Sequence, residues 1–271
     1  MEPWISVSTT RDAARVDGRD GPARFEPAQL DGFEDGARFG VWWMPTEREP
    51  RGTILCVQPL GDERPCARRV ISAQAWRLAA RGWVVLVPDL YGCGDSPGDS
   101  TEITLDAWRN DLLRCAMLVR QRAQGPNVLW GVRAGALLGV DIAVALDQLL
   151  DAHLYWQAPD SGRSAADALA ASARFPARLL ESLGELRMQA PPTAERGAPP
   201  AVAFVESNET PTSLGDVSRA TRALTESWLD AGYLAGARAA RVPPFWDDAQ
   251  FSRPLPDALF DTTEDFLESV H

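Results

Sequence analysis

The stretch Asn127–Leu138 reads N-V-L-W-G-V-R-A-G-A-L-L and combines three local signals. The apolar run Val128–Trp130 predicts a buried strand, and the apolar residues that follow Gly135 predict a helix. Between the two, Gly131 and Gly135 permit a tight turn and close packing of the strand against the helix. The stretch therefore predicts a strand, a sharp turn and a helix in direct succession.

This layout is that of the nucleophile elbow, G-x-S-x-G, of α/β-hydrolases. The position that carries the nucleophile in such an elbow is occupied here by Arg133. A guanidinium group stays protonated and cannot attack a carbonyl carbon. The sequence thus predicts the scaffold of a hydrolase in which the usual nucleophile is replaced.

Apolar strands and amphipathic helices alternate along most of the chain. We expect further strands at residues 37–43, 53–57, 83–87, 152–157, 201–205 and 237–242, and helices at 70–81, 105–122, 134–150, 214–231 and 255–270. This alternation indicates a mostly parallel central sheet flanked by helices, an α/β-hydrolase fold. The first two dozen residues are polar and rich in Gly, and we expect a loose arm there.

The chain of 271 residues can bury one large core, so no second independent domain is required. Residues 164–188 have a helical pattern, and a Pro-rich run follows them. We therefore expect a small helical cap and linker over residues 161–200, inserted between the core segments 1–160 and 201–271.

The composition excludes several classes of function. The net charge is −11 without a basic cluster, which disfavours nucleic acids and anionic membranes as partners. All 27 basic residues are Arg, which excludes Schiff-base chemistry on lysine. The longest apolar run, residues 135–146, is too short to span a bilayer, and the N-terminus does not resemble a signal peptide. We expect a cytoplasmic protein without a membrane span.

The four cysteines, Cys56, Cys66, Cys93 and Cys115, show no C-x-x-C spacing and share the chain with only two histidines. A zinc site is therefore not expected, and neither is a cofactor. Cys56 falls in a predicted strand and Cys115 in a predicted helix, so we expect both in the core. Cys93 is an alternative nucleophile, but no histidine is near it in sequence to activate the thiol.

The other roles of a Ser-His-acid triad fall on later positions. The acid role falls after the strand 201–205, on Glu206 or Glu209. The histidine role falls just after the last predicted strand, where the chain reads P-P-F-W. The two histidines lie elsewhere, as His153, expected in the core or at a strand edge, and the terminal His271. Because loss of a triad Ser or His costs on the order of a millionfold in turnover, an ordinary serine esterase is a poor interpretation.

Arg133 requires an anionic partner, because a buried unpaired cation would cost several kcal/mol. Four protein carboxylates are candidates for this internal salt bridge: Asp62, Glu63, Asp95 and Glu206. A bound carboxylate or phosphate is the alternative, and it is compatible with the salt bridge. The turn Gln58–Arg64 falls where this fold places an oxyanion-hole N–H, which makes Glu63 the best candidate general base. Arg68 and Arg69 are expected at the surface.

The loop Asp89–Ser96 reads D-L-Y-G-C-G-D-S and superficially resembles a phosphate-binding loop. It lacks the third glycine and the helix that such a loop requires. Loops of this kind are a structural feature of many α/β-hydrolases, so we interpret it as structural.

Five strings in sequence order together resemble the family called exosortase A system-associated hydrolase 2. They are Q-P-L-G-D-E-R-P-C-A-R-R, D-L-Y-G-C-G-D-S, L-W-G-V-R-A-G-A-L-L, Y-W-Q-A-P-D-S-G and V-P-P-F-W, between Ala37 and Phe266. The resemblance implies an α/β-hydrolase-like protein of a bacterial protein-sorting and exopolysaccharide system, with arginine at the elbow as a family trait. The chain departs from the family at Gln58, Leu60 and Gly61 and in a shorter cap segment.

Together these arguments predict a cleft at the carboxyl ends of the strands. The candidate catalytic residues are Arg133, Glu63 and Glu206, and the candidate substrate-binding residues are Gln58, Leu60, Cys93, Ser96, Val132, Gln157, Phe245 and Trp246. One hypothesis is a non-standard hydrolase or acyl-transfer enzyme for a small anionic or acylated metabolite. In it, Arg133 binds the anion or oxyanion and Glu63 activates water. The rival hypothesis is a catalytically inactive binding or scaffolding protein, whose partners would be sorting or polysaccharide proteins or a second copy of the chain.

Overall fold

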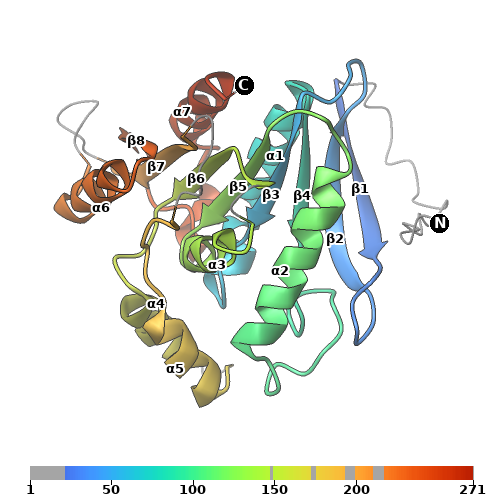
Figure 1. Ribbon diagram of the computed structural model, residues 1–271, viewed down its shortest axis with the longest axis vertical. Helices are drawn as coiled ribbons and strands as arrows, with labels where there is room; N and C mark the ends of the chain where they lie inside the picture. Colours follow the sequence, from blue (N-terminus) through green and yellow to red (C-terminus); the bar gives the residue numbers. More distant parts are fainter. Residues whose placement is uncertain (1–21, 147–148, 172–174, 193–198, 210–216, 271) are drawn as a thin grey trace.

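The computed structural model describes residues 22–146, 149–171, 175–192, 199–209 and 217–270. Its strands form one eight-stranded sheet in the order β1-β2-β4-β3-β5-β6-β7-β8 (Figure 1). The strands are β1 (Ala23–Leu30), β2 (Arg38–Pro45), β3 (Gly52–Val57), β4 (Trp83–Pro88), β5 (Asn127–Val132), β6 (Ala152–Trp156), β7 (Ala201–Ser207) and β8 (Leu234–Ala240). Only β2 runs against its neighbours, so the expected mostly parallel sheet is confirmed.

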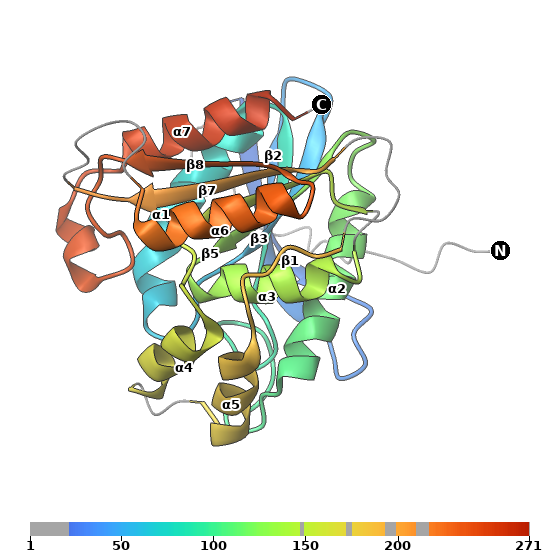
Figure 2. The ribbon, with the colours of Figure 1, turned by 60° about the vertical axis from the view of Figure 1, so that its left-hand side comes forward.

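Helices cover both faces of the sheet (Figures 1 and 2). Apolar residues of α1 (Glu63–Ala80) and α7 (Asp257–Glu268) belong to one hydrophobic cluster. Those of α2 (Leu105–Arg120), α3 (Ala134–Ala143) and α6 (Arg219–Asp230) belong to the other. Since successive strand residues point to opposite faces, the sheet contributes alternate side chains to the two clusters. Cys56 on β3 and Cys115 on α2 are buried as expected.

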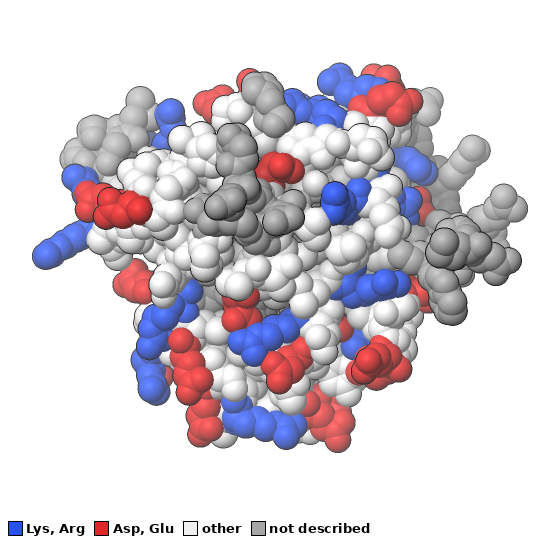
Figure 3. Space-filling model, in the orientation of Figure 1, with Lys and Arg blue, Asp and Glu red and all other residues white. Residues whose placement is uncertain are grey.

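Two short helices, α4 (Gly162–Ala170) and α5 (Ala177–Glu185), connect β6 to β7. They lie together at one end of the molecule, beyond the strand ends (Figure 2). A 3-10 helix, η2 (Asp248–Ser252), precedes α7. No helix among the described residues is long and apolar enough to cross a membrane. On the face shown in Figure 3, the acidic and basic side chains of the described residues are interspersed.

Near the N-terminus, the structure adds a strand that the sequence does not predict, and the predicted start of one helix is wrong. The sequence does not predict strand β1, because its polar residues and Pro27 obscure the apolar alternation of a strand. Pro is tolerated there because β1 is an edge strand that pairs only with β2. Helix α1 begins at Glu63, seven residues before the predicted start. Pro65 lies in its first turn, where the backbone N–H groups have no partner inside the helix.

Predicted boundaries of four elements further along the chain also differ from the structure. Helix α3 ends at Ala143 rather than at residue 150, yet Leu146 and Leu150 beyond it are buried, so the apolar pattern outlasts the helix. Strand β8 begins at Leu234, earlier than predicted, because an edge strand can expose apolar residues. The predicted start of α6 falls partly outside the described residues, and α7 is shorter than predicted by two residues at each end.

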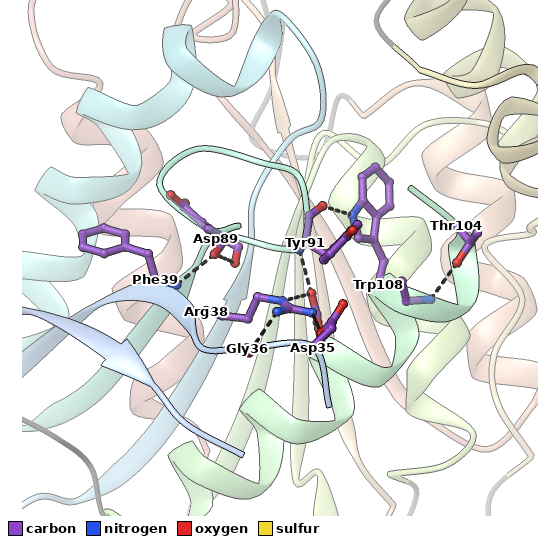
Figure 4. A network of polar contacts seen from close by, with 11 residues as sticks. Asp35, Gly36, Arg38, Phe39, Asp89, Tyr91, Thr104 and Trp108 are labelled. Atoms are coloured by element: carbon purple, nitrogen blue, oxygen red, sulfur yellow. Dashed lines mark hydrogen bonds and ion pairs between the residues drawn. The ribbon is translucent and has the colours of Figure 1, made fainter. Parts of the chain in front are cut away.

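A buried ion pair holds the loop that follows β4 (Figure 4). The Arg38 Nε donates to Asp111 Oδ2 at 2.9 Å, and both side chains are almost fully buried. The same carboxylate oxygen accepts the backbone N–H of Tyr91 at 2.7 Å. Trp108 Nε1 in turn donates to the Tyr91 carbonyl oxygen at 3.0 Å. Strand β2, helix α2 and the loop after β4 are thereby fixed to one another.

Candidate functional site

The elbow predicted from the sequence is present. Arg133 lies between β5 and α3 with φ 54° and ψ −130°, a conformation that costs an L-residue free energy. A Cβ atom on Gly131 would lie 2.6 Å from the Ala136 Cα. A Cβ atom on Gly135 would lie 2.3 Å from the Val57 carbonyl oxygen. Both glycines are therefore needed for the close approach of α3 to the sheet.

The Arg133 side chain is held from two sides. Its Nη2 donates to Glu63 Oε1 at 2.6 Å, and its Nε lies 3.2 Å from each Glu63 oxygen. Its guanidinium carbon lies 4.4 Å from the centroid of the Trp246 ring. Of the four carboxylates that the sequence offered as partners, Glu63 is the one that binds Arg133. The Arg133 and Glu63 side chains are 23% and 26% exposed to solvent, so the salt bridge is in contact with solvent.

One nitrogen of the Arg133 guanidinium group, Nη1, has no hydrogen-bond partner among the described residues. The hydrogen bonds that Arg133 donates to Glu63 involve only Nε and Nη2. Guanidinium carries five N–H donors, two of them on Nη1. Nη1 is therefore available to a ligand without any break in the bond to Glu63.

A pocket of about 430 Å³ opens beside Arg133. Its lining comes from the turn before α1, the elbow, the segment after β6, and helix α4. The lining residues are Leu60, Asp62, Glu63, Arg133, Ala134, Gln157, Ala158, Pro159, Asp160, Ser164, Ala165, Ala168, Leu169 and Ala171. The polar groups of the elbow thus face an apolar wall of small side chains on α4.

Gln157 shares a second unusual feature with Arg133. They are the two non-glycine residues with positive φ in the described part of the chain, with 46° at Gln157. Each directly follows one of two adjacent parallel strands, and both line the pocket. The Gln157 Oε1 accepts the backbone N–H of Ser207 at 2.8 Å, which orients the amide. Backbone strain of this kind concentrates at functional sites.

Glu206 lies at the predicted acid position, at the end of β7, but the structure does not bring it to Arg133. Its buried carboxylate accepts the backbone N–H of Ser218 at 2.7 Å and the Ser218 hydroxyl at 2.6 Å. The Thr221 hydroxyl donates to it as well. These contacts fix Glu206 to the start of α6, where a negative charge is favourable. The other acid candidate, Glu209, is exposed in the loop after β7.

The loop Asp89–Ser96 has the structural role that the sequence predicted. The Ser96 hydroxyl accepts the backbone N–H of Phe39 at 2.8 Å and donates to the Asp89 carbonyl oxygen at 2.5 Å. The Asp89 carboxylate accepts hydrogen bonds from the side chains of Arg64 and Gln58. The predicted binding residues Gln58 and Ser96 therefore hold the loop.

Cys93 lies beside a separate cavity of only about 20 Å³, which Gln58 and Leu60 also line. Burial raises the pKa of the Cys93 thiol to about 11. A thiolate is the reactive form of cysteine, so this environment disfavours a Cys93 nucleophile. Of the candidates on this side, only Leu60 also lines the large pocket.

The remaining predicted site residues belong to the core. Val132 and Phe245 are buried, and Phe245 packs against Trp156 and Trp246. His153 is buried on β6, where its Nδ1 lies 3.0 Å from the Tyr155 hydroxyl oxygen. His271 lies outside the described residues.

Helix α4 and Asp160 were not among the predicted site residues, although the sequence carries a signal for them. Ser161 caps α4 by accepting the backbone N–H of Ser164 at 3.2 Å. A serine before an Ala-rich periodic segment is typical of a helix start. That signal predicts the helix but not that its small residues face the elbow.

Comparisons with known proteins agree with this architecture. No protein-family model matches the chain, and no curated protein matches it. Solved structures do match. An esterase of the bacterial hormone-sensitive lipase family has a TM-score of 0.60 at 16% identity, covering 93% of this chain and 86% of that one. The thioesterase domain from the curacin biosynthetic pathway has a TM-score of 0.58 at 14% identity, covering 90% and 99%.

A third similar structure is XC6422 from Xanthomonas campestris, described as an α/β serine hydrolase without a lid. It has a TM-score of 0.58 at 17% identity, covering 91% of this chain and 95% of that one. Identities this low concern the fold, not the activity. The chain therefore has the α/β-hydrolase fold, and it carries an arginine at the elbow.

Proposed function

We propose that this protein binds a small acylated or carboxylated molecule in the pocket beside the elbow, and that Arg133 contacts its carbonyl or carboxylate oxygen. The main support for this proposal is that Arg133 Nη1 has no hydrogen-bond partner among the described residues. Arg133 also lines an open pocket of about 430 Å³. A hydrogen bond from a charged donor contributes about 1.5–3 kcal/mol. The bond to Glu63 and the stack on Trp246 hold the guanidinium in place before a ligand arrives.

A bound ligand has two candidate fates. In the first, the protein holds its ligand without turnover, because the elbow carries no serine and the segment directly after the last strand, P-P-F-W, carries no histidine. In the second, Glu63 takes a proton from a water molecule, whose oxygen attacks the carbonyl carbon of a ligand held by Arg133. The bond from that carbon to the leaving group then breaks, and Glu63 passes the proton to the leaving group. The observation that supports the second fate is that the Glu63 carboxylate lines the pocket.

The resemblance to exosortase A system-associated hydrolase 2 supports a role in a bacterial protein-sorting and exopolysaccharide system. The ligand would then be an acylated metabolite of envelope polysaccharide synthesis. If the ligand is held without turnover, the ligand-bound protein would interact with sorting or polysaccharide proteins, or with a second copy of itself.

The test measures binding and turnover together. Purified protein is titrated by calorimetry with a panel of p-nitrophenyl esters, acyl-CoA thioesters and the corresponding free acids, and hydrolysis is followed in parallel. Arg133→Ala should weaken binding at least about tenfold. Arg222→Ala, at an exposed position on α6, should leave binding unchanged.

The outcomes separate the candidates. Equal binding by the parent and Arg133→Ala, or no binding at all, overturns the proposal. Hydrolysis that Glu63→Gln abolishes while binding persists identifies an enzyme with Glu63 as its base. Binding without hydrolysis identifies a binding protein.

A further inference from the structure

We infer that the ligand of the elbow pocket is an acyl compound with a positively charged amine, and not an anion. The inference rests on the proposed function, because it concerns the same pocket. The sequence left two classes of ligand open, acylated and anionic, and this inference favours the acylated class. Three features of the lining carry it: the balance of charges, the position of Asp160, and the apolar wall.

The charge balance of the lining is negative. Its charged residues are Asp62, Glu63, Asp160 and Arg133, three carboxylates and one guanidinium, so the formal charge is −2. Glu63 and Arg133 neutralise each other. The exposed Asp160 carboxylate adds a negative charge that this pair does not neutralise. A cleft lined by one sign of charge concentrates ligands of the opposite sign.

Two further carboxylates, Asp247 and Asp248, lie near Cys66 in the first turns of α1, and Asp247 forms an ion pair with Arg253. The pKa of Cys66, one turn along α1 from Asp62, is raised to about 11, first by burial and then by Asp248, with Asp247 and Asp62 contributing. The Cys66 Sγ lies 3.3 Å from Asp248 Oδ1. Within the lining itself, an anionic ligand would meet one guanidinium that is already bound to Glu63, and the exposed carboxylate of Asp160.

The lining of the pocket combines apolar side chains with an exposed carboxylate. Leu60, Ala165, Ala168 and Leu169 form an apolar wall suited to a hydrocarbon chain. Asp160 is exposed and lies three residues beyond Gln157. A ligand with its chain on α4 and its carbonyl oxygen at Arg133 can direct an ammonium group toward Asp160. The lining thus matches an amphipathic acyl amine.

Three esters that share one acyl chain test this directly. The butyryl esters of choline, ethanol and glycolic acid carry a positive, a zero and a negative charge. We expect the choline ester to bind at least about fivefold more tightly than the glycolate ester at low ionic strength. Added salt should reduce this ratio, because the carboxylates are solvent-exposed.

Two matched variants locate the charge effect. Asp160→Asn should lower the choline-to-glycolate ratio at least about twofold. Asp167→Asn removes the same charge from an exposed position on α4 outside the pocket lining, and should leave the ratio unchanged. The readout is a ratio of dissociation constants, so a general loss of folded protein does not alter it.

The results distinguish this inference from the function on which it rests. If the glycolate ester binds as tightly as the choline ester, or if Asp160→Asn leaves the ratio unchanged, the inference is wrong. The proposed function still stands in that case, provided that Arg133→Ala weakens all three esters. If no ester binds, the proposed function fails and the inference fails with it.

Discussion

The guanidinium carbon of Arg133 lies 4.4 Å from the centroid of the Trp246 ring, which joins the elbow to the loop after the last strand. In a serine hydrolase of this fold, that loop carries the histidine that activates the nucleophile. Here it carries an aromatic ring that stacks on a cation, an interaction worth about 0.5–2 kcal/mol. The strained backbone of the elbow is retained, whereas the side chains that would perform nucleophilic catalysis are replaced by a preorganised cation.

Restoring the serine alone should not restore an esterase. We expect Arg133→Ser to hydrolyse p-nitrophenyl esters no faster than the parent, because no histidine among the described residues is near the elbow. His153 is buried on β6 beside Tyr155. Loss of the triad histidine alone costs on the order of a millionfold. A rate increase of a hundredfold or more in Arg133→Ser would contradict this account of the site.

The Arg133–Glu63 pair should show a measurable but modest coupling free energy. Both side chains are about one quarter exposed, so solvent screening limits the interaction to about 1 kcal/mol. Urea denaturation of the parent, Arg133→Gln, Glu63→Gln and the double variant gives this coupling directly. A coupling below about 0.3 kcal/mol would show that the contact does not position Arg133.

Trp246 should contribute to ligand binding through Arg133. Trp246→Leu keeps an apolar side chain but removes the cation–π interaction, and we expect a three- to tenfold weaker affinity for ligands that Arg133 binds. In an Arg133→Ala background, the same substitution should have little effect on affinity. This comparison separates loss of the cation–π interaction from a general change in the conformation of the loop. A similar loss of affinity in both backgrounds would argue against the stacking role.

The sequence predicted the elements that depend on local pattern. The buried strands, the elbow glycines and the loop around Ser96 follow from apolar periodicity and from steric demands that Gly131 and Gly135 alone satisfy. The pocket wall on α4 could not be predicted, because small side chains on a short helix do not reveal what they face. The same holds for Glu206, since a carboxylate after a strand can serve a site or cap a helix.

The thiol of Cys93 should titrate well above the physiological range. Burial raises its folded-state pKa to about 11, against about 8.5 for an unfolded cysteine. A raised pKa means that the folded state binds the proton more tightly, so this stabilisation is complete below about pH 8.5 and is lost as pH rises toward 11.

The corresponding measurement compares unfolding free energies with pH. Cys93→Ala should show a smaller decrease between about pH 8.5 and 11 than the parent, and any ligand binding should be unaffected at pH 7. Rapid alkylation of Cys93 at pH 7, with loss of binding, would instead support a reactive thiol.

Gly135 should tolerate no side chain. A Cβ atom there would lie 2.3 Å from the carbonyl oxygens of both Val57 and Gln58, and these backbone atoms belong to the central sheet and the turn after it. We expect Gly135→Ala to lower the free energy of unfolding by about 3 kcal/mol or more, because α3 must move away from the sheet. Gly184→Ala is the matched control, since the nearest atom to its added Cβ is the Ala166 Cβ at 3.9 Å. That substitution on α5 should be neutral or stabilising by up to about 1 kcal/mol. Equal effects of the two substitutions in urea denaturation would mean that α3 does not pack against β3 as closely as the elbow requires.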